Sequence, residues 1–481
     1  MSLKDYLHTD EHFSDSGTKI VSMGCKYRSE VAPDYECKEP PEPGSDYCIF
    51  HSPSPDPDKF KERLKKQLEG KGRNPRYSFV GYRFPPDWQW DEVLSRKVFS
   101  QRADFRGSMF GTGTDFGGAR FYGGADFEEA MFWGKTSFWW TKFYGDTSFS
   151  RAEFRGHTLF PQTCFGGKAN FWRAKFGGNT HFCEASFSGD VDFEGVEFGG
   201  NASFQGAKFD KDASFQGTKF GGNANFRDSH FAKEVVFRKA SFSAEALFVG
   251  KGDNRLFESV IDFREVDLAQ PKMLQFHHVD LSKCLLRGTD VQEVDFVDVR
   301  WAEKGLFSFF GHDVMKRQAV YDEIYSLEKG DWKALPEIEK LYRQLTHNYE
   351  NARSYSLAGH FHCGAMEMVR KQHRSWWRRN VFSLVALYRY LAGYGEYPSW
   401  PLTVLAVAWV LLAVGFYFLH PTGESWRRLG WALLHSAQAL VFRGAPEGAR
   451  GLTQALGFIG SIIGAMQIAF FLIAIRRRFK R

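Results

Sequence analysis

The sequence predicts a solenoid of short β-strands, followed by α-helices of which the last two are long enough to cross a membrane. Three observations in the 481-residue chain lead to this prediction. Phenylalanine recurs at a fixed spacing through the middle of the chain, helical periodicity follows it, and two uncharged apolar stretches come near the C-terminus. The composition agrees, because 49 Phe need burial while 47 Gly favour tight corners over ordinary helices and strands.

A cluster of cysteine and histidine near the N-terminus has the composition of a metal site. Three thiolates and one imidazole would fill a tetrahedral shell, which is typical of structural zinc rather than of a catalytic ion with an open position. The spacing Cys-x11-Cys-x10-Cys-x2-His is not that of a standard zinc finger, so unrelated buried thiols remain the alternative. The chain begins without an apolar signal segment, so we expect the cysteines in a reducing cytoplasm. The predicted ligands are Cys25, Cys37, Cys48 and His51.

The phenylalanine spacing defines the repeat. Phe occurs every eleven residues at 14 positions from Phe105 to Phe248, and a second series of 13 runs from Phe110 to Phe242. Two residues before each of these 27 Phe stands Ala, Ser, Thr or Val. On a short strand, residues i−2 and i point to the same face, so the pattern predicts paired small and large side chains inside the solenoid. Steps of five and six residues would put successive Phe on opposite sides of a helix, which argues against a helical repeat.

Glycine and asparagine mark the predicted corners, since both residue types tolerate positive φ, and the triplet Gly199-Gly200-Asn201 is one of three such corners. The unit Ala202-Ser203-Phe204-Gln205-Gly206-Ala207-Lys208-Phe209 resembles the Phe-rich variant of the pentapeptide-repeat proteins. That resemblance implies an all-β right-handed quadrilateral β-helix with two eleven-residue steps, or 22 residues, per coil. Each coil packs only on its neighbours, so both ends need a cap. Candidate cap residues are Trp88, Trp90 and Val93 at one end and residues 306–310 at the other.

The surface of the predicted β-helix carries nearly balanced charge. Between Asp104 and Phe248 there are 17 acidic and 16 basic residues, whereas family members that mimic DNA are strongly acidic. The balance argues against mimicry of nucleic acid and gives no support for binding it. The sequence contains no nucleophile elbow, phosphate loop, H-E-x-x-H or paired-carboxylate motif, so we predict no enzymatic activity. A rigid spacer, or a docking surface for an unknown protein partner, is the expectation.

Helical periodicity begins near residue 313 and continues to about residue 380. It predicts two antiparallel helices with a break near residues 354–356. We expect His360, His362, His373 and Glu367 of the second helix to form a polar face rather than a metal site, because His362 and His373 are too far apart for one helical turn. The predicted domains are an N-terminal segment (1–80), the β-helix with its N-terminal cap (81–302), a helical cytoplasmic linker (303–396) and a transmembrane domain (397–481).

Two segments are long and apolar enough to cross a bilayer, residues 401–420 and residues 455–475. Basic residues precede the first segment and follow the second, which by the positive-inside rule predicts a multi-pass protein of the inner membrane with both termini in the cytoplasm. Membrane lipids are therefore expected partners. Gly460 and Gly464 provide a small-residue face for packing of the second span.

Residues 427–442, between the two spans, are apolar enough to re-enter the membrane but too short to cross it. The order of helix, re-entrant helix, helix and basic end is similar to the two-transmembrane, pore-loop half of potassium-channel-like proteins. Potassium selectivity requires a Thr-Val-Gly-Tyr-Gly carbonyl stack, which this chain lacks, and Arg443 would oppose cations. The pore-loop candidates are Ser436, Gln438, Val441, Phe442, Arg443 and Gly444.

Two functions follow from these predictions. The first is a channel-like homo-oligomer whose cytoplasmic β-helix senses a partner and regulates the membrane part. The second is a non-conducting, membrane-tethered scaffold that recruits a cytoplasmic partner through the β-helix.

Overall fold

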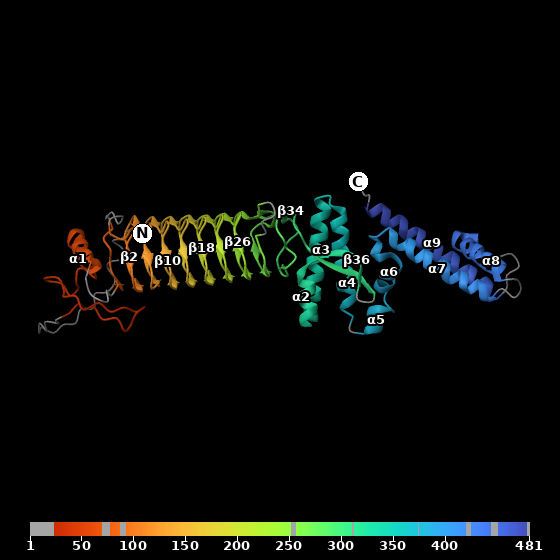
Figure 1. Cartoon of the computed structure of the whole chain (residues 1–481), viewed down its shortest axis with the longest axis horizontal. Coiled ribbons are helices and arrows are strands. Elements are labelled where there is room, and N and C mark those ends of the chain that lie inside the picture. Colours follow the sequence, from red (N-terminus) through yellow and green to blue (C-terminus); the bar gives the residue numbers. More distant parts are fainter. Residues whose placement is uncertain are drawn as a thin grey trace. The chain divides into compact units, whose positions relative to one another are not determined.

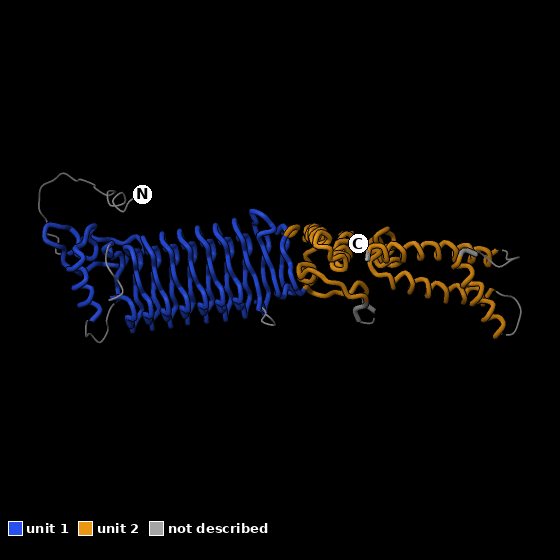
Figure 2. The backbone as a smooth tube through the Cα atoms, turned by 90° about the horizontal axis from the view of Figure 1, so that it is seen from above, with its two compact units in different colours: residues 1–290, 294–300 blue, residues 291–293, 301–481 orange. Residues whose placement is uncertain are grey.

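A computed structural model describes residues 24–69, 77–86, 93–251, 256–309, 312–373, 375–419, 425–443 and 451–478. The chain forms two compact units (Figure 2). The first comprises residues 1–290 and 294–300, and the second comprises residues 291–293 and 301–481. The finer division at residues 80, 302 and 396 stays a prediction.

The first unit is a β-solenoid of about 10 turns, as the phenylalanine pattern predicts (Figure 1). Its described strands are mostly two residues long and form four parallel sheets of 10, 7, 8 and 9 strands. A strand from each sheet follows in turn along the chain, so one coil contributes to all four sheets. The right-handed sense of the coil stays a prediction.

Within each sheet, every strand pairs with the strands of the coils before and after it. The first sheet contains, in pairing order, β1 (Tyr77–Ser78), β3 (Ala103–Asp104), β7 (Ala125–Asp126), β11 (Thr147–Ser148), β15 (Ala169–Asn170), β19 (Val191–Asp192), β23 (Ala213–Ser214), β27 (Val235–Val236), β30 (Ile261–Asp262) and β33 (Cys284–Leu285). The second contains β2 (Val98–Phe99), β6 (Arg120–Phe121), β10 (Lys142–Phe143), β14 (Cys164–Phe165), β18 (Ser186–Phe187), β22 (Lys208–Phe209) and β26 (His230–Phe231). The third contains β31 (Asp267–Leu268), β28 (Ser241–Phe242), β24 (Lys219–Phe220), β20 (Glu197–Phe198), β16 (Lys175–Phe176), β12 (Glu153–Phe154), β8 (Met131–Phe132) and β4 (Met109–Phe110). The fourth contains β34 (Asp295–Val297), β32 (Leu274–His277), β29 (Ala246–Val249), β25 (Ala224–Asn225), β21 (Ala202–Ser203), β17 (Thr180–His181), β13 (Thr158–Leu159), β9 (Thr136–Ser137) and β5 (Thr114–Asp115).

The register repeats every 22 residues through most of the solenoid. Ala103 pairs with Ala125, and Phe143 pairs with Phe165. The repeat lengthens after residue 250, where Phe248 pairs with Phe276. A constant register brings chemically identical positions of successive coils into contact, which is what the eleven-residue spacing requires.

The interior is filled by the phenylalanine ladder. All 27 rings are at most 2% exposed, and the small residue two positions before each is at most 3% exposed, so the predicted inward pairs are confirmed. Rings of successive coils stack almost parallel, as for Phe105 and Phe127 at 4.8 Å and 1°. Rings from neighbouring sides meet edge to face, as for Phe116 and Phe127 at 5.5 Å and 78°. Both geometries are favourable for aromatic quadrupoles, so the core combines burial with specific ring contacts.

The Gly-Gly-Asn corners are present, but the reason predicted for them is wrong. Their glycines do not adopt positive φ. Instead, a Cβ on Gly200 would lie 2.7 Å from the carbonyl carbon of Gly178, so glycine is required because adjacent coils approach each other closely. The asparagines form a ladder in which the backbone N–H of Asn201 donates to Oδ1 of Asn179 at 3.0 Å, and that of Asn223 donates to Asn201 at 2.9 Å.

Positive φ occurs at a different position, two residues after each Phe of the first series from 105 to 237. The φ values there lie between 52° and 69°, and eight of the 13 residues are not glycine, among them Glu129 and Arg151. Each non-glycine residue costs about 1 kcal/mol in this conformation. The ladder hydrogen bonds and buried rings on either side impose the turn, so tertiary structure overrides local preference.

The N-terminal end of the solenoid is capped by helix α1 (Pro57–Glu69). Its apolar face buries Phe60, Leu64 and Leu68, and the Phe60 ring lies 5.4 Å from Phe84, which stacks on Phe110. Of the cap residues predicted from the sequence, Val93 is buried, and Trp88 and Trp90 lie outside the described residues.

The second unit begins with a β-hairpin of β35 (Ala302–Phe309) and β36 (His312–Ala319). The helix predicted from residue 313 is wrong up to residue 319, because this segment forms the strand β36 and pairs with β35. Leu306 and Phe307, predicted to cap the solenoid, pack in this unit with Cys363 and Tyr394. The described helical elements that follow are α2 (Tyr321–Lys329), η4 (Trp332–Ala334), α3 (Leu335–Asn351), α4 (Tyr355–Lys371), α5 (Trp376–Asn380), α6 (Leu384–Ala392), η5 (Gly393–Gly395), α7 (Ser399–Leu419), α8 (Ser425–Gln438), the π-helical η6 (Ala439–Arg443) and α9 (Leu452–Arg478).

Candidate metal centre and interaction surfaces

The structure brings Cys25, Cys37, Cys48 and His51 into one buried cluster that could hold a metal ion. Their ligand atoms all lie within 4.8 Å of one another. The Sγ atoms of Cys37 and Cys48 are 3.7 Å apart, and Nδ1 of His51 lies 3.2 Å from the Sγ of Cys48. Tetrahedral coordination with metal–sulfur bonds of about 2.3 Å requires sulfur atoms about 3.8 Å apart, and the Cys37–Cys48 pair has this spacing.

The surroundings of the cluster fix the orientation of His51. Its Nε2 lies 2.9 Å from the carbonyl oxygen of Val80, so the ring donates there and leaves Nδ1 facing the three sulfurs. The ring of Tyr27 stacks on the imidazole at 4.0 Å and 8°. Hydrogen bonding between the two thiols lowers the pKa of Cys37 and raises the pKa of Cys48, so Cys37 is the thiol of this pair that ionises more readily. The Val80 carbonyl could not be found from the sequence, since any residue can supply one.

Four large aromatic side chains are exposed on neighbouring coils of the solenoid, each between 48% and 57%. They are Tyr122, Trp139, Trp140 and Tyr144, which we call the aromatic patch. The two tyrosine rings stack at 4.7 Å, and the two tryptophan rings lie 5.0 Å apart. Arg120 and Lys142, two residues before the tyrosines, are exposed and pair in the second sheet. The patch therefore combines apolar area with positive charge on a rigid backbone.

The second unit contains two buried charge clusters. In the first, Glu323 is fully buried and accepts hydrogen bonds from Arg317 at 2.5 Å and from the Tyr342 hydroxyl at 2.6 Å. Lys371 and Lys304 also lie 3.0 Å and 3.3 Å from this carboxylate. Burial alone would raise the pKa of Glu323, but its basic neighbours outweigh burial and hold the pKa well below its usual range.

The second cluster surrounds Glu367 on α4. Arg370 and Arg389 lie 2.9 Å and 3.0 Å from its carboxylate, and the Tyr394 hydroxyl donates to it at 2.7 Å. Burial opposes ionisation, yet the hydrogen bond from Arg370 and the charge of Arg389 lower the pKa of Glu367. Glu367, which we expected on a polar face of this helix, is buried and paired with two arginines. Burial, together with nearby cations, lowers the pKa of His362 on the same helix to about 4.

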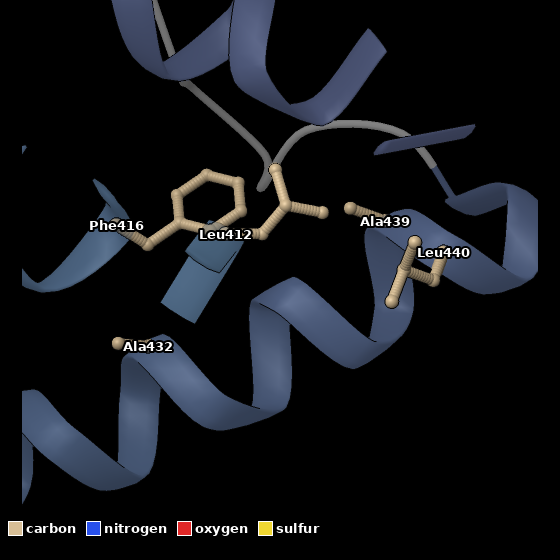
Figure 3. Close-up of a cluster of buried hydrophobic side chains, with 5 residues drawn as sticks. All are labelled: Leu412, Phe416, Ala432, Ala439 and Leu440. Atoms are coloured by element: carbon tan, nitrogen blue, oxygen red, sulfur yellow. The ribbon is translucent and has the colours of Figure 1, made fainter. Parts of the chain in front are cut away.

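Among the described residues, α7 and α9 are the two helices long and apolar enough to span a membrane. In the most apolar 18-residue stretch of each helix, only 17% (α7) and 22% (α9) is buried, whereas the core helix of a soluble protein would be mostly buried. Helix α8 packs beside α7, and a small cluster joins α7, α8 and η6 (Figure 3). Its residues are Leu412, Phe416, Ala432, Ala439 and Leu440. The exposed apolar faces therefore need an apolar environment outside this chain.

The predicted pore-loop residues lie at the end of α8 and in η6. Ser436 is buried and donates to the Leu433 carbonyl at 3.0 Å, whereas Val441 is 66% exposed. Gln438 ends α8 and Phe442 and Arg443 belong to η6, while Gly444 lies outside the described residues. The predicted packing glycines face this segment. A Cβ on Gly464 would overlap the Leu440 carbonyl oxygen, and one on Gly460 would lie 2.9 Å from the Cβ of Ala439.

A family model described as pentapeptide repeats (9 copies) matches residues 171–219. These residues lie within the regular coils, so the match and the solenoid support the same repeat. The match does not reach α7, α8 or α9, and the resemblance of that segment to potassium-channel-like proteins stays a prediction. No curated protein matches the chain, and no solved structure does.

Proposed function

We propose that the chain is a membrane-tethered docking protein whose solenoid recruits a cytoplasmic protein. The observation that carries this proposal is the aromatic patch. Four aromatic side chains that are about half exposed on a rigid surface leave apolar area that water solvates poorly, and Trp, Tyr and Arg dominate binding energy at protein interfaces. The flanking Arg120 and Lys142 favour a partner whose surface combines apolar side chains with carboxylates.

The tether is formed by α7 and α9. Their length and their outward apolar faces suit a bilayer. Six basic residues between Glu367 and Glu396 and the basic end of the chain favour a cytoplasmic location for both flanks. A multi-pass inner-membrane protein with the solenoid in the cytoplasm follows from this orientation.

The docking proposal is tested by cross-linking in intact cells, comparing the wild-type chain with a variant in which the four residues of the aromatic patch are replaced by Ala. We expect the variant to lose a specific cross-linked protein while it stays in the membrane fraction. The matched control is Trp172→Ala, a half-buried tryptophan on another coil. Equal cross-linking of the patch variant and the wild-type chain would contradict the proposal.

We further propose that the cysteine–histidine cluster holds a structural zinc ion, with Cys25, Cys37, Cys48 and His51 as ligands. Support comes from the donor set, the distance between the Cys37 and Cys48 sulfurs and the orienting contact from Val80. Bound zinc would supply folding energy to a segment that has little apolar core of its own and would hold it on the first coil.

Elemental analysis tests the zinc proposal. We expect one zinc per chain, lost in Cys48→Ser and retained in Cys164→Ser, whose thiol lies on the solenoid surface. A zinc-free wild-type chain with unchanged thermal stability would rule the site out.

A second candidate function, a channel-like homo-oligomer, is favoured by one contact. The close approach of Leu440 to Gly464 lies nine residues into the predicted span 455–475, or about 14 Å along a helix axis, which is near the middle of a hydrocarbon core of about 30 Å. That depth suits a re-entrant helix. Ion flux into liposomes together with a native mass of several chains would support the channel, with no cation selectivity expected because of Arg443. A monomeric chain that gives no ion flux would contradict the channel and leave only the proposal of a membrane tether.

A further inference from the structure

The segment that leads into α7 exposes an unusual amount of apolar surface. Trp376 and Trp377 are each 60% exposed, Phe382 is 74% exposed and Leu384 is 85% exposed. Val381 and Leu387 are also exposed, and we call these six residues the interfacial patch. All of them lie on α5, on α6 or in the turn between them.

This surface is held firmly rather than frayed. Buried Arg370 donates from Nη1 to Oδ1 of Asn380 at 2.8 Å and to the Arg379 carbonyl at 3.2 Å, so it fixes the end of α5. The same guanidinium is paired with Glu367 in the buried charge cluster. The side chain of Ser383 accepts from the Ala386 N–H at 3.0 Å and caps α6. The core of the second unit therefore presents the interfacial patch in a defined conformation.

Contacts between α6 and the two spanning helices show where along those helices the interfacial patch lies. The ring of Tyr388 on α6 lies 6.1 Å from Phe470, which is inside the apolar part of α9. At the start of α7, the Trp400 indole donates to the Tyr390 carbonyl at 2.9 Å. Helix α6 thus lies at the cytoplasmic ends of both spanning helices, where a headgroup layer would be.

The charge around the patch has one sign. Between Glu367 and Glu396 the sequence contains no acidic residue and six basic ones. Arg370 and Arg389 are committed to Glu367, whereas Arg378 is exposed beside the two tryptophans. Tryptophan and arginine together, next to a spanning helix, match the chemistry of an interface rich in anionic lipid.

We propose that the interfacial patch lies in the cytoplasmic headgroup layer and binds anionic phospholipid. This inference rests on the proposed membrane tether and goes beyond it, because it gives the second unit a lateral contact with the bilayer surface. Insertion of the tryptophan rings at the headgroup level, with Arg378 among the lipid phosphates, would fix the orientation of α4 and of the buried charge clusters relative to the membrane.

The test uses the full chain in nanodiscs that contain phosphatidylcholine brominated near the headgroup, which quenches nearby tryptophan emission. The wild-type chain is compared with a Trp376→Phe/Trp377→Phe variant. If the two patch tryptophans and the four on α7 and α8 contribute equally, the variant loses about a third of the quenched emission. The matched control is Trp139→Phe/Trp140→Phe, an adjacent exposed pair on the solenoid, which should leave the quenched emission unchanged.

A second arm tests the lipid charge. We expect phosphatidylglycerol in the nanodisc to increase quenching of the patch tryptophans, and Arg378→Gln to remove that increase. Quenching that is unaffected by the Trp376→Phe/Trp377→Phe change would overturn the interfacial proposal while the tether stands. Absence of quenching from any tryptophan would reject the tether itself. Patch tryptophans with blue-shifted emission and no quenching by lipid would assign the surface to a second copy of the chain and overturn the proposal.

Discussion

Removing one ring from the middle of the phenylalanine ladder tests the solenoid core directly. Phe171 is fully buried and stacks between Phe149 at 5.1 Å and Phe193 at 4.7 Å. Edge-to-face contacts join it to Phe160 at 5.9 Å and Phe182 at 5.5 Å. The change Phe171→Ala removes all of these contacts without touching the surface.

The expected loss is at the upper end of the range for large-to-small core changes. Such changes at phenylalanine cost about 3–5 kcal/mol, depending on how far the cavity can collapse. In the solenoid the backbone of each coil is fixed on both sides, since the Phe171 N–H donates to the Asp192 carbonyl at 2.7 Å and the Phe149 N–H donates to the Asn170 carbonyl at 2.6 Å. The neighbouring rings therefore cannot move in, and we expect a loss of about 4–5 kcal/mol.

Hydrogen exchange followed by mass spectrometry measures this loss where it occurs. Amide exchange in the coils around residue 171 should accelerate by about a thousandfold, the factor that corresponds to roughly 4 kcal/mol of opening free energy. The control Lys175→Ala removes an exposed side chain from the same coil and should change exchange by less than about threefold. An acceleration below about tenfold for Phe171→Ala would refute the claim that stacked rings hold the coils together.

Three further outcomes are expected. Gly200→Ala should lower the thermal midpoint of the solenoid more than Gly199→Ala does, because the new Cβ would lie 2.7 Å from a backbone atom at residue 200 and 3.2 Å from one at residue 199. Equal changes of the midpoint, followed by circular dichroism, would contradict this expectation. Because the pKa of Glu367 is lowered in the folded chain, its ion pairs stabilise the fold above the unfolded-state pKa of about 4.3, and this stabilisation is lost as the pH falls through the folded-state pKa. Glu367→Gln should therefore lower the thermal midpoint at pH 7 and make that midpoint fall less steeply in acid. Gly464→Ala should destabilise the membrane segment in detergent, whereas Gly430→Ala, with no atom within 4 Å, should not; the reverse order would show that the Leu440 contact is unimportant.

The solenoid was predictable because its inside and outside are encoded locally and repeated without exception. Every coil places a small residue and Phe at the same positions, and a one-residue shift would expose the ring. The cysteine–histidine cluster was also predictable, since four possible metal ligands, among them Cys48 and His51, are rare in one short segment. The reason for the Gly-Gly-Asn corners was not, because close approach between coils depends on residues 22 positions away.

The buried charges could not be predicted from local pattern. Glu323 forms an ion pair with Lys371, which is 48 residues away in the sequence, and Glu367 forms one with Arg389 on a different helix. Within either helix the carboxylate has the spacing of a solvated face, and only the tertiary structure supplies its partners. The β-hairpin was missed for a similar reason, since the pairing of Phe307 with Val314 is a contact between two strands that neither helical nor strand periodicity specifies.

The constant 22-residue pairing makes the coils interchangeable modules. Gain or loss of one whole coil would leave all four ladders and both ends in register and would change the reach of the protein by about 4.8 Å, the spacing between neighbouring strands. Outside the regular coils the ladders also accept a longer coil, as after residue 250, where Phe248 pairs with Phe276. Evolution can therefore adjust the length of this domain in uniform steps, while the sequence at either end stays the same.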